Sequence, residues 1–258
     1  MMGEFSELLR YRDLLRLLIG KIIKTRYKRS ALGVVWALLN PLLTMAVMTI
    51  AFSALFRGAV TNYPLYILSG LICWNFFSQT TAYAMHSLVW GGSLLRRVYV
   101  PRTIFAVASV GHGLVNFTLT MLPLLVIIAV MGHAFHATWW FVPIAVLLLA
   151  LFALGVALFM STLAVFFVDV LDLYQVFLQA WFFLTPVMYP ESILPAEYAW
   201  ILRFNPMHYL LELFRAPILH GSLPAAGTIL AACAWTFGAL AAGWFTLARK
   251  ADEFAYRL

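Results

Sequence analysis

The chain has 258 residues, of which 64% are hydrophobic and 10% are charged, and its mean hydropathy is +0.92. Because soluble globular domains carry about 25% charged residues, this composition excludes a soluble domain and indicates a membrane protein. A net charge of +7 would suggest nucleic-acid binding if the basic residues formed one surface stripe. Most of them flank apolar segments instead, so they are better explained by orientation in the membrane, and we expect no nucleic-acid partner.

The N-terminal segment, residues 5–23, is predicted to form an amphipathic helix. Its apolar residues recur at helical spacing with charged residues opposite, although Arg12 and Arg16 intrude on the apolar side and Leu14 and Leu17 on the polar side. A basic helix directly before a membrane span is typical of helices that lie in the plane of the interface near anionic headgroups. An ordinary cytoplasmic helix is the alternative.

Six later segments are apolar and long enough to be considered as spans of a hydrocarbon core of about 30 Å. We predict transmembrane helices at 33–56, 65–90, 103–131, 139–168, 173–189 and 227–248. Asn40-Pro41 lies inside the first of them, where proline removes a backbone donor and is expected to kink the helix. The expected fold is therefore a single all-α transmembrane domain, 1–258, with an interfacial helix before six spans.

The basic residues predict which ends of these spans face the cytoplasm. Of the 17 Lys and Arg residues, eight precede the first span, three lie in the loop 93–102 and three lie in the tail. Since Lys and Arg concentrate in cytoplasmic loops, both termini are expected to be cytoplasmic. The N-terminus is expected to be retained, because its first 30 residues lack the short apolar run of a signal peptide.

The stretch 190–224 differs from the spans in composition, because it is richer in proline and in charged residues. Prolines at 195, 206, 217 and 224 divide it, and it carries Glu191, Glu197, Arg203, Glu212 and Arg215. No uninterrupted piece is long enough to cross a membrane, so we predict two short re-entrant or surface helices at the outer side.

The sequence contains no recognisable motif for nucleotide binding or for a metal site. The one Gly-Lys pair, Gly20-Lys21, is not part of a phosphate-binding loop, and His133 and His136 lack the Cys or carboxylate partners of a metal site. The interiors of the predicted spans are almost free of acidic, basic and histidine residues, which argues against a proton or ion path, and their main polar residues are mostly carboxamides. They are expected to form helix–helix hydrogen bonds: Gln79, His112, Asn116, Gln175 and Gln179.

Four stretches resemble a known family. They are TRYKRSALGVVWALLNP at 25–41, RRVYVPR at 96–102, FFLTPVMYP at 182–190 and FNPMHYLLELFR at 204–215. Nearly the whole chain is similar, in order, to the membrane permeases of polysaccharide-exporting ABC transporters, and most closely to the O-antigen and teichoic acid branch. The motifs do not distinguish which glycan is carried or its length.

The resemblance implies a homodimer in the bacterial inner membrane, each subunit docked on a separate cytoplasmic ABC ATPase. ATP and Mg would bind that partner, and this chain would have no catalytic residue and no cofactor. The substrate would be an undecaprenyl-linked polysaccharide. A non-transporting scaffold of a glycan-synthesis complex is the alternative. A membrane-embedded glycan enzyme would require a carboxylate pair or a His cluster near a span end, for which Asp169 and Asp172 are the acidic pair considered.

The loop 93–102 corresponds to the family's coupling helix, which seats in a cleft of the ATPase. The residues implied in this contact are Leu94, Leu95, Arg96, Arg97, Val98 and Tyr99. A simple anchoring role for its arginines is the alternative. At the other cytoplasmic turn many relatives carry Arg where this chain has Val168, so an ATPase contact there is in doubt.

The stretch 190–224 corresponds to the family's outer gate helices, for which Asn205, Pro206, Glu212 and Arg215 are the candidates here; an extracytoplasmic cap is the alternative.

Sugar rings stack their C–H faces on aromatic rings, so the conduit is expected to be rich in aromatic residues. The conduit candidates are Trp36, Asn40, Pro41, Trp74, Phe77, Trp181, Phe182 and Tyr189, with lipid-facing or core packing as the alternative. Trp139, Trp140, Trp200 and Tyr256 are expected in the interfacial belts.

Overall fold

The computed structural model of the chain describes residues 11–27, 33, 35–56, 60, 62–91, 101 and 103–250, with the backbone alone described at 23–27. The seven longer helices are α2 (Arg12–Tyr27), α3 (Val35–Phe56), α4 (Tyr63–Trp90), α6 (Thr103–Val130), α7 (Val142–Phe166), α8 (Val170–Leu184) and α11 (Ala226–Lys250). The short ones are η1 (Ala137–Phe141), η2 (Glu191–Ile193), η3 (Ala196–Tyr198), α9 (Ala199–Arg203), α10 (Pro206–Arg215) and the π-helical η4 (Ala216–His220). The described ranges contain no strand, which confirms the predicted all-α class.

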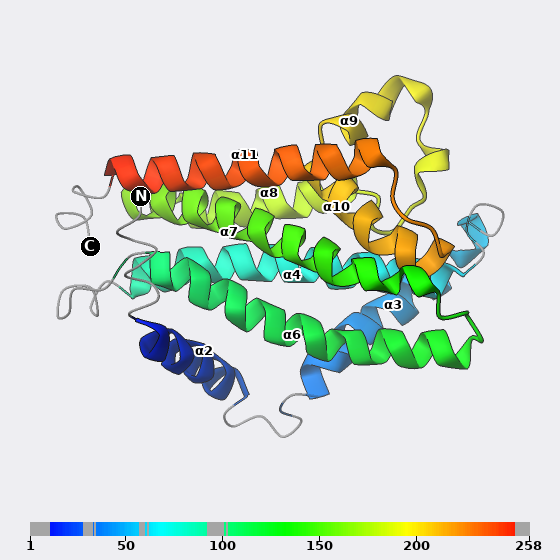
Figure 1. Cartoon of the computed structure of the whole chain (residues 1–258), viewed down its shortest axis with the longest axis horizontal. Helices are drawn as coiled ribbons and strands as arrows, with labels where there is room; N and C mark the ends of the chain where they lie inside the picture. The colour runs from blue at the N-terminus through cyan, green and yellow to red at the C-terminus, as the bar shows by residue number, and fades with distance from the viewer. Residues whose placement is uncertain are drawn as a thin grey trace.

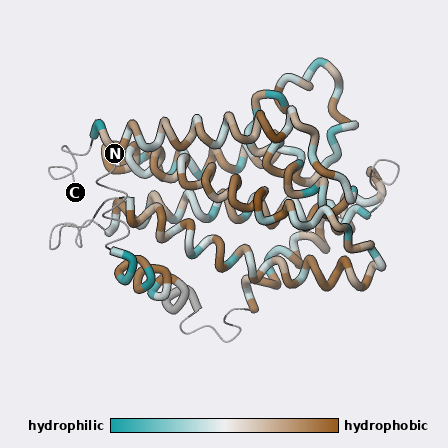
Figure 2. Tube along the Cα trace, viewed as in Figure 1, coloured by the Kyte–Doolittle hydropathy of each residue, from teal (hydrophilic) through white to brown (hydrophobic). Residues whose placement is uncertain are grey.

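In the part of the chain that the structure describes, four stretches of helix are long and apolar enough to cross a membrane. They are Val35–Phe56, Thr103–Val130, Ala137–Phe166 and Ala226–Lys250. Hydrophobic residues dominate these helices along their length, whereas hydrophilic residues gather on α2 and on the loops at one end (Figure 2). The protein is therefore membrane-embedded.

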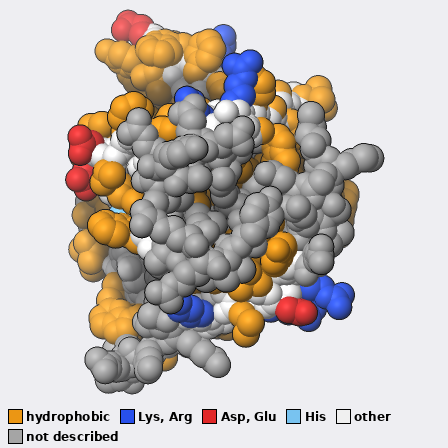
Figure 3. All heavy atoms as spheres, turned by 90° about the vertical axis from the view of Figure 1, so that its left-hand side faces the viewer, with side chains coloured by type: hydrophobic (Ala, Val, Ile, Leu, Met, Phe, Trp, Pro, Cys, Tyr) orange, Lys and Arg blue, Asp and Glu red, His pale blue; other side chains and the backbone are white. Residues whose placement is uncertain are grey.

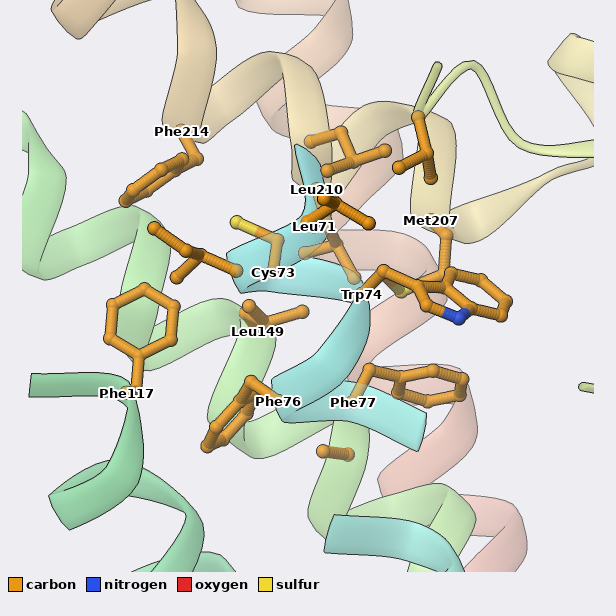
Figure 4. Packing of buried hydrophobic residues seen from close by; sticks show 14 of the residues in the cluster. Leu71, Cys73, Trp74, Phe76, Phe77, Phe117, Leu149, Met207, Leu210 and Phe214 are labelled. Carbon is orange, nitrogen blue, oxygen red and sulfur yellow. The ribbon is translucent and has the colours of Figure 1, made fainter. Parts of the chain in front are cut away.

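Helix α4 lies at the centre of the bundle and packs against α3, α6, α7 and α8 (Figure 1). Most of its side chains are buried, and its middle turns place Trp74 and Phe77 among side chains of three other helices. Figure 4 shows this part of the core, with Phe117 from α6, Leu149 from α7 and Met207, Leu210 and Phe214 from α10 around α4. The short helices 191–220 gather at the end of the bundle opposite the last residues of α11 (Figure 1). Because the sequence predicts that this end faces away from the cytoplasm, it is called the outer end below and its short helices the outer helices.

Helices α7 and α11 form the most extensive pair in the bundle, and two glycines permit it. A Cβ atom added at Gly155 would lie 2.5 Å from the backbone carbon of Ala239, and one added at Gly243 would overlap the carbonyl oxygen of Gly155. Small residues at such a crossing let two backbones approach closely, which is how helices associate where no water drives them together.

Helix α2 lies against α6 at the edge of the bundle. Leu14, Leu15 and Leu18 pack on a second buried cluster, and Ile19 reaches Gly111 of α6. The packed face of α2 therefore includes Leu14, which the helical wheel put on the polar side, and omits Arg16, which the wheel put on the apolar side and whose side chain is 80% exposed. Leu17 remains on the exposed side, as predicted, with an exposed fraction of 70%.

In the end-on view of the molecule, the described Lys, Arg, Asp and Glu side chains lie at the rim, among hydrophobic ones (Figure 3).

Candidate functional site

An open cleft of about 850 Å³ lies along α3, α4, α6 and α8. Five of the eight residues predicted for a conduit line it: Trp36, Asn40, Pro41, Trp74 and Phe182. Helix α3 supplies the first three from its N-terminal half, where the hydroxyl of Thr44 donates to the carbonyl oxygen of Asn40 at 2.9 Å. Proline lacks an N–H, so this turn has one backbone donor fewer than a regular helix.

The cleft wall also carries the polar residues that the sequence assigned to helix–helix hydrogen bonds. Gln79, His112, Asn116, Gln175 and Gln179 all line it. The contact between the side chains of His112 and Asn116, 3.2 Å from Nε2 to Nδ2, lies within α6 rather than between helices. Asn75 and Ser78 extend the polar surface. The sequence indicates that these residues lie at a similar depth in the membrane. It does not indicate that they line one cleft, because that depends on how three helices are rotated relative to one another.

A cluster of aromatic rings closes one side of the cleft. The ring of Trp74 meets those of Trp181 and Phe182 edge-on, with centroids 6.0 and 5.5 Å apart, and Phe77 meets Trp181 at 5.2 Å. Phe77 is fully buried and stacks on Phe152 of α7, so it lies in the core rather than on the cleft wall. Trp181 supports the wall from behind, and neither residue lines the cleft.

Asn205 ties α10 to the end of α8. Its Oδ1 caps α10 by accepting from the backbone N–H of Met207 at 3.0 Å, and it also accepts from Nε1 of Trp181 at 2.9 Å. Its Nδ2 donates to the carbonyl of Leu184 at 3.1 Å and to the hydroxyl of Thr185 at 2.9 Å. A single buried carboxamide thus uses both its acceptor and its donors to join the aromatic cluster to the outer helices.

Arg215 occupies the centre of the outer end. It is 3% exposed, and its guanidinium donates to the carbonyls of Pro186 (2.6 Å), Val187 (2.8 Å) and Tyr66 (3.0 Å) and to the hydroxyl of Ser69 (3.3 Å). Its Cζ lies 3.8 Å from the centre of the Tyr66 ring. The three carbonyls, the hydroxyl and the ring, referred to below together with Arg215 as the Arg215 clamp, compensate the buried charge with dipoles and a π-face.

A second cavity of about 710 Å³ opens at this outer end and is polar. It is lined by Asn62, Tyr66, His133, Glu191, His208, Glu212, Arg215 and His220, among others. Nδ1 of His208 lies 3.1 Å from Oε1 of Glu191, which joins η2 to α10 by an ion pair when the imidazole is protonated. Burial alone raises the pKa of the Glu191 carboxyl, but the hydrogen bond and charge of His208, with Arg215, lower it below its usual value overall.

The remaining candidates are spread over the outer end. Pro206 begins α10, and Glu212 lies on the same helix and lines the outer cavity. The carbonyl of Tyr189 accepts from the hydroxyl of Tyr66 at 2.9 Å, but Tyr189 lines neither cavity. Val168 is 57% exposed in the turn between α7 and α8.

The expected coupling residues, 94–99, lie outside the described residues. The same holds for Tyr256 of the expected belt. No group of three or more His, Cys, Asp or Glu side chains is placed to hold a metal ion in the part of the chain that the structure describes. Tyr66, Ser69 and Gly70 could not be predicted as neighbours of Arg215, because they lie almost 150 positions earlier in the chain.

An apolar helical bundle with a cleft of aromatic and carboxamide side chains, and with outer helices fixed around a buried arginine, has the construction of a membrane transport subunit. Residues 13–219 match the ABC-2 type transporter family, so the chain belongs to that family.

Relatives of known name agree with this assignment. The chain is 32% identical over 253 residues, 96% of each chain, to the O-antigen export system permease protein RfbA of Myxococcus xanthus. It is 27% identical over 212 residues, 82% of each chain, to the protein of the same name from Klebsiella pneumoniae. It is 24% identical to the polysialic acid transport protein KpsM of Escherichia coli, over 77% of this chain and 78% of that protein.

Proposed function

We propose that this chain is the membrane subunit of an ATP-driven exporter that moves a lipid-linked polysaccharide of the O-antigen or teichoic acid type across the bacterial inner membrane. The observation that carries the proposal is the cleft, whose wall combines ring faces such as Trp36 and Trp74 with carboxamides such as Gln175 and Gln179. Rings stack on the C–H faces of sugars and carboxamides pair with hydroxyls, and neither contact fixes one register of a polymer. The relatives named above, which are named for O-antigen export and polysialic acid transport, support a polysaccharide substrate.

The proposed topology has six spans, with α4 and α8 added to the four apolar helices. Helix α4 has 28 residues and most of its polar residues line the cleft or are buried, and its length of roughly 42 Å suffices for a span. Helix α8 has 15 residues, roughly 22 Å, which is short for a span. The segment 185–189, whose carbonyls are held by Arg215 and by the hydroxyls of Tyr63 and Tyr66, would complete the crossing. Both termini would face the cytoplasm, with α2 at the interface.

The exporter would contain two copies of this chain and two ABC ATPase subunits that bind ATP and Mg. The exposed rings along α3 and α8 support a second copy at the open side of the cleft: Trp36 is 51% exposed, Phe177 53% and Phe183 55%. The loop 93–102 would couple each copy of this chain to its ATPase subunit, with Arg96 and Arg97 in contact with the ATPase. The outer helices around Asn205 and Arg215 would form the exit gate.

Chemical blocking of the cleft tests the proposal. Gln179 and Ala180 are adjacent exposed residues of α8, but Gln179 lines the cleft and Ala180 does not. We expect a bulky maleimide on Gln179→Cys to abolish export of lipid-linked glycan in cells that also express the ATPase, and the same reagent on Ala180→Cys to leave at least about half of it. Cys233→Ser provides the background, because Cys73 is fully buried. Equal export from the two labelled variants would contradict a role for the cleft in transport.

A further inference from the structure

The cleft wall differs from most polar binding surfaces in its charge. None of the described residues that line it is Asp, Glu, Lys or Arg. Its polar groups are instead carboxamides, hydroxyls and two imidazoles. The carboxamides come from all four helices: Asn40, Asn75, Gln79, Asn116, Gln175 and Gln179.

A carboxamide offers two donors and an acceptor but no net charge. It therefore matches a sugar hydroxyl, which also donates and accepts. It cannot compensate a carboxylate or phosphate, and a charge moved to membrane depth without an opposite charge is costly, even where water reaches it. A polymer with one anionic group in every repeat would meet that cost continuously as it moves.

Among the described residues that line the outer cavity, Arg215 is the one Lys or Arg, and its guanidinium already donates to three carbonyls and a hydroxyl within the protein. The exposed Arg203 of α9 lies at the same end but does not line this cavity. Glu191 and Glu212 line the same cavity and would repel an anionic chain.

From this charge pattern we infer that the chain is selective for uncharged glycans. The cleft takes a polymer of neutral sugars and rejects one that carries a carboxylate or a phosphate in each repeat. This inference rests on the proposed function and narrows it, because it favours a neutral O-antigen type of chain over a phosphate-linked chain of the teichoic acid type.

The test compares two labelled oligosaccharides of equal length on the full chain in lipid nanodiscs. The neutral probe is an α-linked mannohexaose and the anionic probe is a hexamer of galacturonate, each carrying the same fluorophore, with binding followed by fluorescence anisotropy. We expect the mannohexaose to bind at least about 10-fold more tightly, with an affinity that salt does not change. Equal affinity, or tighter binding of the galacturonate, would overturn the inference while leaving a glycan cleft intact. Failure of both probes to bind would count against the proposed function itself.

A matched pair of variants isolates charge from shape. Gln175 is exposed on the cleft wall, so Gln175→Lys introduces a cation and Gln175→Glu an anion at one position. The lysine variant is expected to gain at least about fivefold in galacturonate affinity, and this gain should disappear at high salt. The glutamate variant is expected to show no gain. A gain in both variants, or in neither, would mean that charge at the cleft wall does not set the selectivity.

Discussion

Gly70 is the residue on which the Arg215 clamp depends. A Cβ atom at this position would overlap Nη2 of Arg215 and would lie 2.9 Å from the carbonyl oxygen of Val187. The guanidinium therefore lies directly on the α4 backbone, and any larger residue must displace either the charge or the carbonyls that hold it.

We predict that Gly70→Val lowers the free energy of unfolding by about 3 kcal/mol, since a buried charge loses its hydrogen bonds when one side of its site is filled. The measurement is thermal unfolding in detergent, followed by size-exclusion chromatography with fluorescence detection. Gly238→Val is the control, because a Cβ atom at Gly238 meets nothing within 4 Å. Equal melting temperatures for the two variants would show that Gly70 is not required.

The pair formed by Glu191 and His208 is expected to make the stability of the outer end depend on pH. The pKa of Glu191 is lowered in the folded protein, so its contribution to stability is present above the pKa of the unfolded chain, about 4.3. That contribution is lost as the pH falls through the lower folded value.

We therefore predict that the melting temperature of the wild-type protein falls below about pH 4.5, and that Glu191→Gln reduces this fall while lowering stability at pH 6. Melting curves between pH 6 and pH 3.5 provide the measurement. Glu197→Gln serves as the control, since Glu197 lies in the same exposed segment and has no ion-pair partner among the described residues. A parallel pH profile for wild type and Glu191→Gln would exclude the pair as the cause.

At the scale of single residues, the sequence predicted which residues are important at the outer end better than it predicted the residues that they contact. It identified Arg215 and Asn205 as candidates of the outer end because they lie in a recognisable motif, and the structure gives both a central role in that end's hydrogen bonding. Their partners could not be predicted, because Ser69 and Tyr66 are brought to Arg215 by helix packing over a separation of almost 150 residues.

At the scale of elements, the α7–α11 crossing gives the sharpest test. Gly243 and Gly238 lie on the same helix, but a Cβ atom at Gly243 would overlap the backbone of α7 whereas one at Gly238 would not. We predict that Gly243→Val destabilises the protein by at least about 2 kcal/mol and Gly238→Val by less than about 0.5 kcal/mol. The yield of correctly eluting protein after graded heating measures both, and a similar loss in the two variants would contradict a close crossing.

The helices themselves follow from hydropathy, and the clearest ends follow from local chemistry. Helix α8 ends at Leu184, directly before Thr185-Pro186, since the residue before a proline is pushed out of the helical region. Helix α10 begins at Pro206 after the cap at Asn205, as the motif Asn-Pro indicates. The helix rotation that turns Gln79 toward the same cleft as Gln175 could not be predicted, because α4 has no clear polar face and its rotation is set by its neighbours.

At the scale of the whole molecule, the proposed coupling to an ATPase can be separated from simple anchoring. Arg96 and Arg97 lie among the implied contact residues, whereas Arg102 lies at the start of the next span. We predict that Arg96→Ala combined with Arg97→Ala reduces substrate-dependent ATP hydrolysis of the purified exporter at least about 10-fold. Arg102→Ala, which removes an anchoring charge only, should change it less than about twofold. Equal effects would mean that these arginines act by anchoring.

The Arg215 clamp also has a consequence for the order in which the protein is made. Its partners, from Tyr66 to Val187, all leave the ribosome before Arg215 does. Until that residue is synthesised, the 186–187 carbonyls lack the cation that holds them against α4. A nascent chain stopped before residue 215 should therefore keep its outer end accessible to protease, and one extended through α11 should be protected. The hydrogen bonds of Arg215 therefore form late in biogenesis, after most of the bundle has entered the membrane.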